Sequence, residues 1–166
     1  MPTSSTSATK RNASARVTVQ YAVPRAGLPA ATRFRAWAQA ALERPAEVTV
    51  RIVGEDEGRA LNLRFRGHDK ATNVLTFAYS DTEPLFGDIA LCAPVAVREA
   101  SERSIGLDAH LAHLTVHGVL HLQGYDHENA GDAVLMEARE SRIVTALGYA
   151  DPYEVRREER GVRREA

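Results

Sequence analysis

The stretch His117-Gly-Val-Leu-His-Leu-Gln-Gly-Tyr-Asp-His127 carries three histidines at positions i, i+4 and i+10. On a helix, His117 and His121 lie about one turn apart and project from the same face. Gly124 can adopt the left-handed conformation that ends a helix, so the chain can turn back and bring His127 towards the first two rings. Three imidazoles are a ligand set that zinc favours, with the fourth tetrahedral position open to water or substrate. The stretch therefore predicts a catalytic metal site.

Two other kinds of zinc site are weighed against this prediction. A structural zinc usually has four protein ligands, often cysteines, and the single cysteine, Cys92, is distant in the sequence. The histidine spacing also occurs in metzincin proteases, where a general-base glutamate follows the first histidine. Gly118 stands at that position here, so a peptidase would need another base, such as Asp88 or Glu128. An open, catalytic site that is not an ordinary peptidase is favoured.

The helix that precedes the turn is predicted over residues 107–122. At 100° per residue, His110 and His113 fall within the same arc as His117 and His121, and apolar side chains occupy most of the remaining surface. The helix is therefore expected to be mostly buried, with a seam of histidines that opens into a cleft. His113 is a candidate for contact with a substrate phosphate, and a supporting or surface role is the alternative.

The rest of the chain predicts an α+β fold in one domain. Alternating or apolar runs predict strands over 16–23, 47–53, 74–79 and 86–92, and helices are predicted over 30–42, 55–65, 94–104, 107–122 and 130–147. A small mixed sheet of about four strands, covered by about five helices, fits this order. Core positions include Trp37, Leu61 and Phe65, together with Val134 and Leu135 in the last helix.

Composition limits the classes of function. The 166 residues suffice for one domain with a real core, and the formal net charge of −1 gives no global attraction for nucleic acid, so any such contact needs a local patch. One cysteine excludes an internal disulfide framework and fits a reducing compartment. No apolar run is long enough for a membrane span or a signal peptide, so a cytoplasmic protein without a membrane partner is expected. Residues 1–15 are predicted to be a disordered tail, 16–153 the domain, and 154–166 a charged tail.

Four segments in order resemble the YbeY family of bacterial rRNA-maturation endoribonucleases. They are the His117–His127 stretch, Leu61-Asn-Leu-Arg-Phe-Arg-Gly-His-Asp-Lys-Ala-Thr-Asn-Val-Leu-Thr-Phe77, Gly87-Asp-Ile-Ala-Leu91 and Ala146-Leu-Gly-Tyr-Ala-Asp-Pro-Tyr153. The likeness covers residues 17–155. Ala71 and Thr76 stand where the family pattern has proline and serine, and neither departure removes a charge or a ligand.

The resemblance implies a metallo-endoribonuclease. His117, His121 and His127 match the family's zinc ligands, which implies one Zn²⁺ per chain, and Arg66 matches an arginine that acts at the active site. The implied fold is a mixed sheet with helices packed around it. The implied substrate is single-stranded RNA, above all the 3′ end of 16S rRNA, with a role in ribosome quality control. The implied partners are the small ribosomal subunit and its associated factors.

Elementary chemistry agrees with this activity. Zinc polarises a phosphoryl oxygen, and RNA can supply its own 2′-hydroxyl as nucleophile, which eases the absence of a protein base. Attack by water activated on the metal stays open as the alternative. A guanidinium such as that of Arg66, expected in a loop before a strand, matches the charge that builds on phosphorus. Lys70, Thr72 and Asn73 in the same loop are candidates for phosphate and base contacts. A zinc metallopeptidase-like hydrolase and a non-catalytic ribosome-assembly factor are the competing hypotheses.

Overall fold

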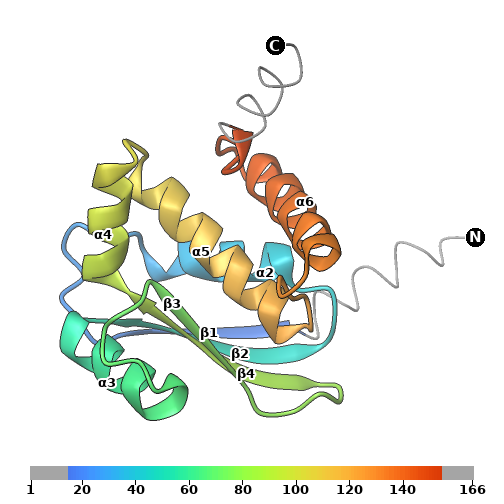
Figure 1. The fold of residues 1–166 in the computed structure, drawn as a ribbon, viewed down its shortest axis with the longest axis horizontal. Coiled ribbons are helices and arrows are strands. Elements are labelled where there is room, and N and C mark those ends of the chain that lie inside the picture. Colours follow the sequence, from blue (N-terminus) through green and yellow to red (C-terminus); the bar gives the residue numbers. More distant parts are fainter. Residues whose placement is uncertain (1–14, 155–166) are drawn as a thin grey trace, which may run out of the picture.

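Four strands form a mixed sheet in the computed structural model of this chain, which describes residues 15–154 (Figure 1). The strands are β1 (Ala15–Tyr21), β2 (Ala46–Val53), β3 (Val74–Ala78) and β4 (Leu85–Cys92), in the spatial order β1-β2-β4-β3. β1, β2 and β4 are parallel to one another, and β3 runs antiparallel to β4 at the edge. Within the described residues the helices are α2 (Ala31–Ala41), α3 (Glu55–Arg66), α4 (Ala93–Glu102), α5 (Leu107–Leu122) and α6 (Ala130–Ala146). The predicted fold class is confirmed, and the predicted tails lie outside the described residues apart from Ala15 and Glu154.

The two faces of the sheet differ because side chains alternate along each strand. In β2, Val48, Val50 and Ile52 are buried on one face, while Thr49 and Arg51 point to the other. α2 and α5 lie across the apolar face (Figure 1). The polar face is covered only in part, by α3, which packs against β4 and α4.

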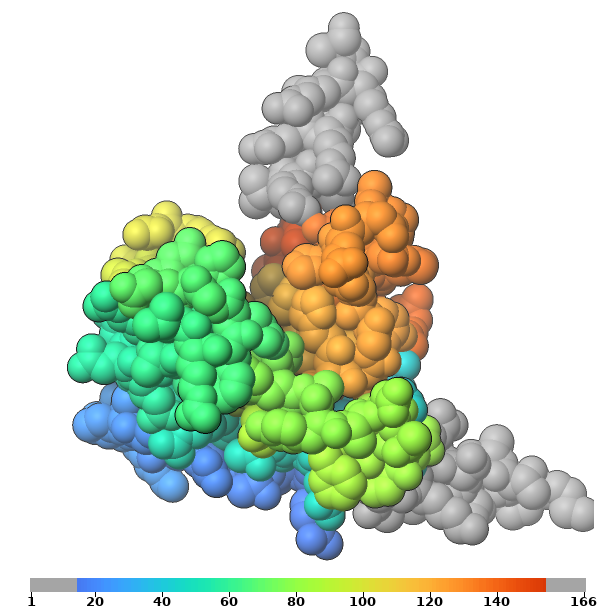
Figure 2. Space-filling view, turned by 60° about the horizontal axis from the view of Figure 1, so that its bottom comes forward, coloured from blue at the N-terminus to red at the C-terminus, as the bar shows by residue number. Residues whose placement is uncertain are grey.

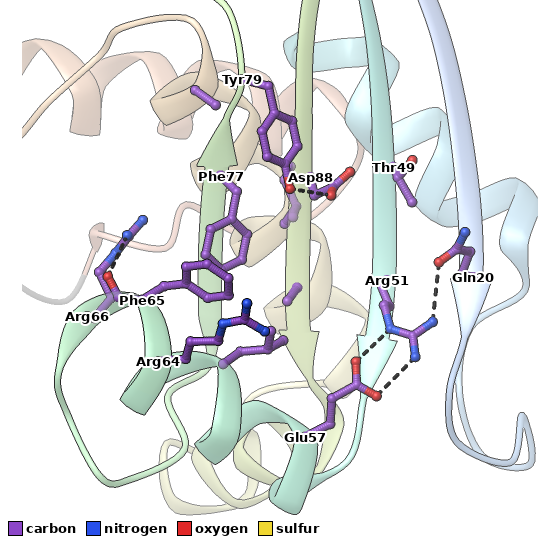
Figure 3. Close-up of a pocket in the computed structure, with 14 residues that line it drawn as sticks. Gln20, Thr49, Arg51, Glu57, Arg64, Phe65, Arg66, Phe77, Tyr79 and Asp88 are labelled. Carbon is purple, nitrogen blue, oxygen red and sulfur yellow. Dashed lines mark hydrogen bonds and ion pairs between the residues drawn. The ribbon is translucent and has the colours of Figure 1, made fainter.

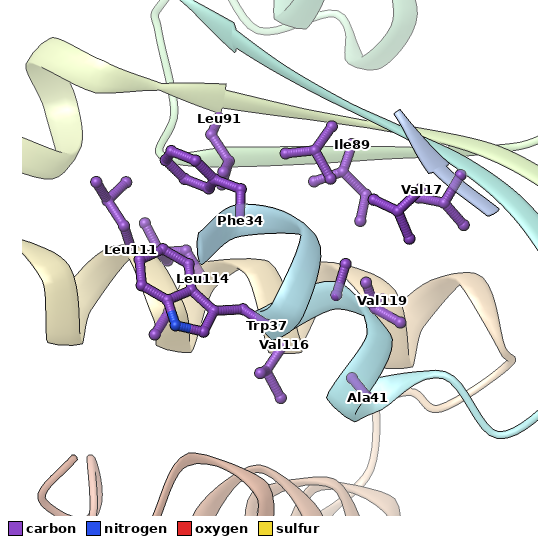
Figure 4. Packing of buried hydrophobic residues seen from close by; sticks show 14 of the residues in the cluster. Val17, Phe34, Trp37, Ala41, Ile89, Leu91, Leu111, Leu114, Val116 and Val119 are labelled. Atoms are coloured by element: carbon purple, nitrogen blue, oxygen red, sulfur yellow. The ribbon is translucent and has the colours of Figure 1, made fainter. Parts of the chain in front are cut away.

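The main core fills the space between the apolar face, α2 and α5 (Figure 4). Phe34 and Trp37 of α2 meet edge to face at 5.1 Å between ring centroids, and Trp37 is buried as predicted. Ile89 and Leu91 of β4 and Leu111 of α5 are fully buried in the same cluster. This packing holds α5 rigidly across the sheet, so it fixes the position of every side chain that α5 carries.

α3 differs from its prediction in two respects. The helix turns Gly58 and Asn62 towards the fold, and Phe65, predicted to be in the core, is 48% exposed. Arg66, predicted to lie in a loop, is the last residue of the helix, because the N–H of Gly67 still bonds to the carbonyl of Leu63 at 3.0 Å. α3 therefore presents aromatic and cationic side chains to solvent beside the polar face of the sheet.

α6 corrects a further prediction. Val134 and Leu135, expected in the core, are 62% and 66% exposed, because α6 packs mainly on α5 and buries a different stripe of residues. That stripe contains Met136, Glu140, Ser141 and Val144. A buried glutamate in such a stripe needs hydrogen-bond partners, since an unpaired buried carboxylate is costly. Across residues 15–154, no helix has the length and apolar character needed to cross a membrane.

Candidate metal centre

α5 and the turn after it bring the three histidines together. His117 and His121 lie one turn apart on α5, with ring centroids 4.6 Å apart. α5 ends at Leu122, and Gly124 takes a φ of +97°, the left-handed conformation that its sequence position predicts. The chain then doubles back, so the His127 ring lies 5.6 Å from that of His117 and 4.9 Å from that of His121.

The three imidazoles fit a single divalent ion. One ring nitrogen from each histidine lies within 4.8 Å of the other two. In the part of the chain that the structure describes, no cysteine, carboxylate or further histidine joins this group. Three nitrogen ligands without a fourth protein ligand are typical of catalytic zinc sites, whereas structural sites are closed by four.

His121 is held in the form that binds metals. Burial lowers the pKa of His121, and the neighbouring His117 and His127 lower it further, because protonated rings at this spacing would repel one another. A neutral imidazole has a free lone pair, which a metal ion requires. The packing of the site therefore favours metal binding over proton binding at this ring.

A buried glutamate that sequence analysis missed supports His117. Glu140 of α6 is 1% exposed, and its Oε1 lies 2.6 Å from His117 Nδ1 and 3.1 Å from His113 Nε2. Its Oε2 accepts a hydrogen bond from the hydroxyl of Tyr153 at 2.7 Å. Burial alone would raise the pKa of this carboxyl, but the hydrogen bonds from His113 and His117 outweigh it and lower the pKa from 4.5 to about 2. Glu140 is therefore a carboxylate.

The charge of Glu140 determines which ring nitrogen of His117 carries the proton. A carboxylate can only accept, so His117 Nδ1 carries the proton and donates it to Oε1. The lone pair of His117 is then on Nε2, the nitrogen left for a metal ion. Carboxylates that hold ligand histidines in this way orient the ring and increase its basicity. The spacing of 23 residues between His117 and Glu140 has no local sequence signal, although a lone glutamate on a buried helical stripe would have drawn attention to it.

We expect Glu140→Gln to weaken metal binding while the fold persists. Glutamine keeps the shape of the side chain but removes the negative charge that fixes the His117 tautomer. Loss of such a supporting carboxylate typically costs about 10- to 100-fold in metal affinity. The dissociation constant for Zn²⁺ can be measured by competition with a chromophoric chelator. Glu102→Gln, which removes the same charge from an exposed site at the end of α4, is the control, and equal affinities in both variants would contradict the role of Glu140.

Arg66 lies at the edge of the sheet, beside β3. α5, the helix that carries His117 and His121, packs against this strand. Its Nη2 donates to the carbonyl of Thr76 in β3 at 2.7 Å. On the other side of β3, Thr76 Cγ2 is 3.3 Å from the place where a Cβ on Gly118 would stand. One edge strand therefore separates the guanidinium from the helix that carries His117 and His121.

The other residues predicted to contact the substrate lie in three different surroundings. Lys70 and Thr72 line a hollow of about 350 Å³ together with Arg66. The side-chain amide of Asn73 instead donates to Glu99 at 3.0 Å, which ties the loop to α4. His113 is engaged by Glu140 and lies beside the metal group. Contact of Lys70, Thr72, Asn73 or His113 with a substrate stays a prediction.

The two carboxylates considered as general bases for a peptidase lie in different parts of the structure. Asp88 alternates with the buried Ile89 on β4, so it points to the polar face, away from α5, and accepts a hydrogen bond from Tyr79 at 2.7 Å. Glu128 is exposed in the turn before α6. Gly118 faces the sheet, where an added Cβ would stand 3.1 Å from Ile89 Cγ2. A glutamate at position 118 would therefore point into packed side chains and not towards the metal group.

Fold and site together define a class: an α+β domain with three histidines suited to one divalent metal, supported by a buried carboxylate. Comparison with known proteins identifies the family. The family model for Endoribonuclease YbeY matches residues 28–148. An Endoribonuclease YbeY of Nitrosomonas eutropha is 58% identical over 137 residues, 82% of this chain and 97% of that protein. Another, of Aromatoleum aromaticum, is 53% identical over 152 residues, 89% of this chain and 99% of that protein. The chain belongs to the YbeY endoribonuclease family.

A solved structure shares the fold. The solution structure of a Thermotoga maritima protein matches with a TM-score of 0.54 and 28% sequence identity. The match covers 90% of this chain and 95% of that one. The resemblance to the family that the four sequence segments indicate is thus confirmed by sequence, and the α+β fold by structure.

Proposed function

We propose that this chain is a metal-dependent endoribonuclease that cleaves single-stranded RNA, with one Zn²⁺ held by His117, His121 and His127. The observation that carries the proposal is a group of three imidazoles without a fourth protein ligand in residues 15–154. The relatives named as endoribonucleases, at 51–58% identity, supply the type of substrate. Arg66, one strand away, supplies a positive charge suited to a phosphodiester.

Each proposed residue has a defined task. Zinc, when bound, supplies a Lewis acid that polarises a phosphoryl oxygen. Arg66 stabilises the additional negative charge on phosphorus through charge-assisted hydrogen bonds, which are strongest in the transition state. Glu140 orients His117 and keeps its proton on Nδ1. The nucleophile is the substrate's own 2′-hydroxyl or water, and Zn²⁺, when bound, would ease the loss of its proton in the absence of a carboxylate at position 118.

The cellular task that we propose is maturation of the 3′ end of 16S rRNA and quality control of ribosomes, in contact with the small ribosomal subunit and its associated factors. This follows from membership of the family together with the RNA chemistry proposed for the site. The proposal includes a cytoplasmic location, because the single cysteine, Cys92, is buried and unpaired, as in proteins of reducing compartments.

Removal and return of the metal test the proposal. Purified protein would be stripped with a chelator, reloaded with Zn²⁺, and given a single-stranded RNA and the same sequence as a duplex. We expect cleavage of the single strand by the loaded protein, loss of cleavage after stripping, and little cleavage of the duplex. Full activity in stripped protein would contradict metal dependence, and failure of fully loaded protein on single strands and on ribosomal subunits would favour the assembly-factor hypothesis.

Arg66→Ala is expected to reduce the rate of RNA cleavage by about 10²- to 10³-fold, the usual effect of removing one donor that stabilises transition-state charge. Arg66 is exposed, so metal content should not change, and the free energy of unfolding should shift by no more than about 0.5 kcal/mol. Arg66→Lys should restore only part of the rate, since lysine lacks the bidentate geometry. Arg103→Ala, at an exposed site directly after α4, is the control; an unchanged rate in Arg66→Ala would contradict the role.

A further inference from the structure

The polar face of the sheet is open beside α3. Sheets of parallel strands are usually covered on both faces, but the polar face of β1, β2 and β4 is covered only in part, by α3. The uncovered part forms a groove of about 550 Å³ between α3 and strands β2, β4 and β3 (Figure 3). The side chains that characterise this groove are Arg51, Arg64, Phe65, Arg66, Phe77 and Tyr79.

Three aromatic rings line one side of the groove. Phe65 and Phe77 meet edge to face at 5.2 Å between centroids, and Tyr79 follows Phe77 along the chain (Figure 3). Phe65 is 48% exposed and Tyr79 66% exposed. A single exposed aromatic residue is ordinary, but rings from a helix and a strand gathered in one groove provide a surface on which flat, aromatic groups can stack.

Positive charge accompanies these rings. The guanidinium of Arg64 lies 5.1 Å from the centre of the Phe65 ring, and that of Arg66 lies 5.3 Å from the centre of Phe77. Within residues 15–154, neither arginine forms an ion pair. They supply a local positive patch on a chain whose net charge is −1.

The acidic side chains of the groove are already engaged. Glu57 receives two hydrogen bonds from Arg51, at 2.6 and 3.0 Å. Asp88 accepts the hydroxyl of Tyr79 at 2.7 Å, and this hydrogen bond raises the pKa of Tyr79. The groove therefore offers two guanidinium groups to an anion. Among residues 15–154, no cationic side chain forms an ion pair with its second carboxylate, Asp88.

The groove meets a second hollow at Arg66. Arg66 lines the groove and also the hollow that contains Lys70 and Thr72. In Figure 2, α3 and the loop after it (green) stand on one side and the start of α6 (orange) on the other, with the region of β3 and β4 (yellow-green) lower between them. A chain that passes Arg66 would lie in both the hollow and the groove.

We propose that the groove binds the single-stranded RNA substrate beyond the point of cleavage, with bases stacked on Phe65 and Tyr79 and a phosphate at Arg64. This inference rests on the proposed function and adds a second contact region to it. Aromatic platforms beside arginines bind single strands without strong sequence preference, because every base has a flat face. A duplex, whose bases are already stacked on one another, gains nothing from these rings.

Binding of oligonucleotides of two lengths tests the groove. The probes are fluorescent 2′-O-methyl RNAs of about 4 and about 16 nucleotides, a range that covers typical single-strand sites. The 2′-O-methyl group blocks the 2′-hydroxyl, so this hydroxyl cannot attack the adjacent phosphate of the probe. Zinc-loaded protein is used at a fixed salt concentration. We expect Phe65→Ala/Tyr79→Ala to weaken binding of the long probe by at least about 30-fold, because two stacked bases are lost at about 1–3 kcal/mol each.

Control variants separate the possible causes. Leu63→Ala/Val97→Ala removes two apolar side chains of similar exposure, 49% and 46%, outside the groove and should bind as the wild type does. Arg64→Glu reverses the charge of an exposed side chain and should also weaken the long probe. Thermal unfolding of each variant reports whether the fold persists.

The outcomes distinguish this inference from the proposed function. One outcome is that wild-type protein cleaves single-stranded RNA and both groove variants bind the long probe as tightly as the wild type. This outcome would overturn the inference about the groove and leave the proposed function intact. Wild-type protein that neither binds nor cleaves RNA would overturn both. The inference is supported if the wild type binds the long probe more tightly than the short one and both groove variants lose most of this difference in affinity.

Discussion

Replacement of His117 and His121 by alanine is expected to abolish both metal binding and RNA cleavage. A zinc site with four ligands yields about 10–16 kcal/mol, so each imidazole is worth about 2.5–4 kcal/mol, or about 100- to 1,000-fold in the dissociation constant. Two ligands lost together leave His127 alone on an exposed turn. Metal content by elemental analysis and cleavage of single-stranded RNA, measured on the same samples, check this result.

The fold should survive this double substitution. Both rings are only partly buried at the edge of α5, and alanine favours a helix. His68→Ala, which removes an exposed imidazole from the loop after α3, controls for metal content and should retain one Zn²⁺. A double variant that still binds one equivalent would contradict the assigned ligands. Equal RNA cleavage by wild type and double variant would show that the nuclease activity comes from elsewhere.

Gly118→Glu is expected to cost about 3–5 kcal/mol of the free energy of unfolding, the penalty of a buried charge without a partner. The Cβ alone would stand 3.1 Å from Ile89 Cγ2 and 3.3 Å from Thr76 Cγ2, closer than packed side chains normally allow. The remaining carboxylate would then have to enter the contact between α5 and the sheet. Since whole domains are stable by about 5–15 kcal/mol, the loss should be evident in chemical denaturation.

A matched glycine provides the comparison. Gly131 is exposed in the first turn of α6, where a negative charge is favoured by the helix dipole, so Gly131→Glu should be neutral or slightly stabilising. The same stability in Gly118→Glu and wild type would mean that this face of α5 is not packed as described. The predicted penalty also explains the difference from metzincins: the helix position that holds their general base is here used for contact with the sheet.

Much of the site depends on α5 having distinct faces. Gly118 permits close contact with β3 and β4, and Leu111 belongs to the core shared with α2. The face with His113 and His117 meets Glu140 of α6. A helix held on several sides places its ligands with little freedom, and this rigidity is what a catalytic metal site requires.

The sequence by itself determined those features that depend on local periodicity. Alternation in β2, the spacing of His117 and His121, and the left-handed turn at Gly124 follow from the geometry of strands, helices and glycine. Together with the order of strands and helices they predicted the mixed sheet and the group of three histidines, whereas the family was indicated by the resemblance of four segments. Each depends on residues within a few positions of one another, so a single segment contains the whole signal.

Only the tertiary structure decided which surfaces met. Glu140 joined His117 across 23 residues, and Phe65 and Leu135 were left exposed although their helical spacing predicted a core. An amphipathic pattern shows that a helix has an apolar side, but not how much of that side its neighbours cover. The supporting carboxylate and the open groove arise from contacts between distant segments, and such contacts are set by how α3 and α6 pack, which no local pattern encodes.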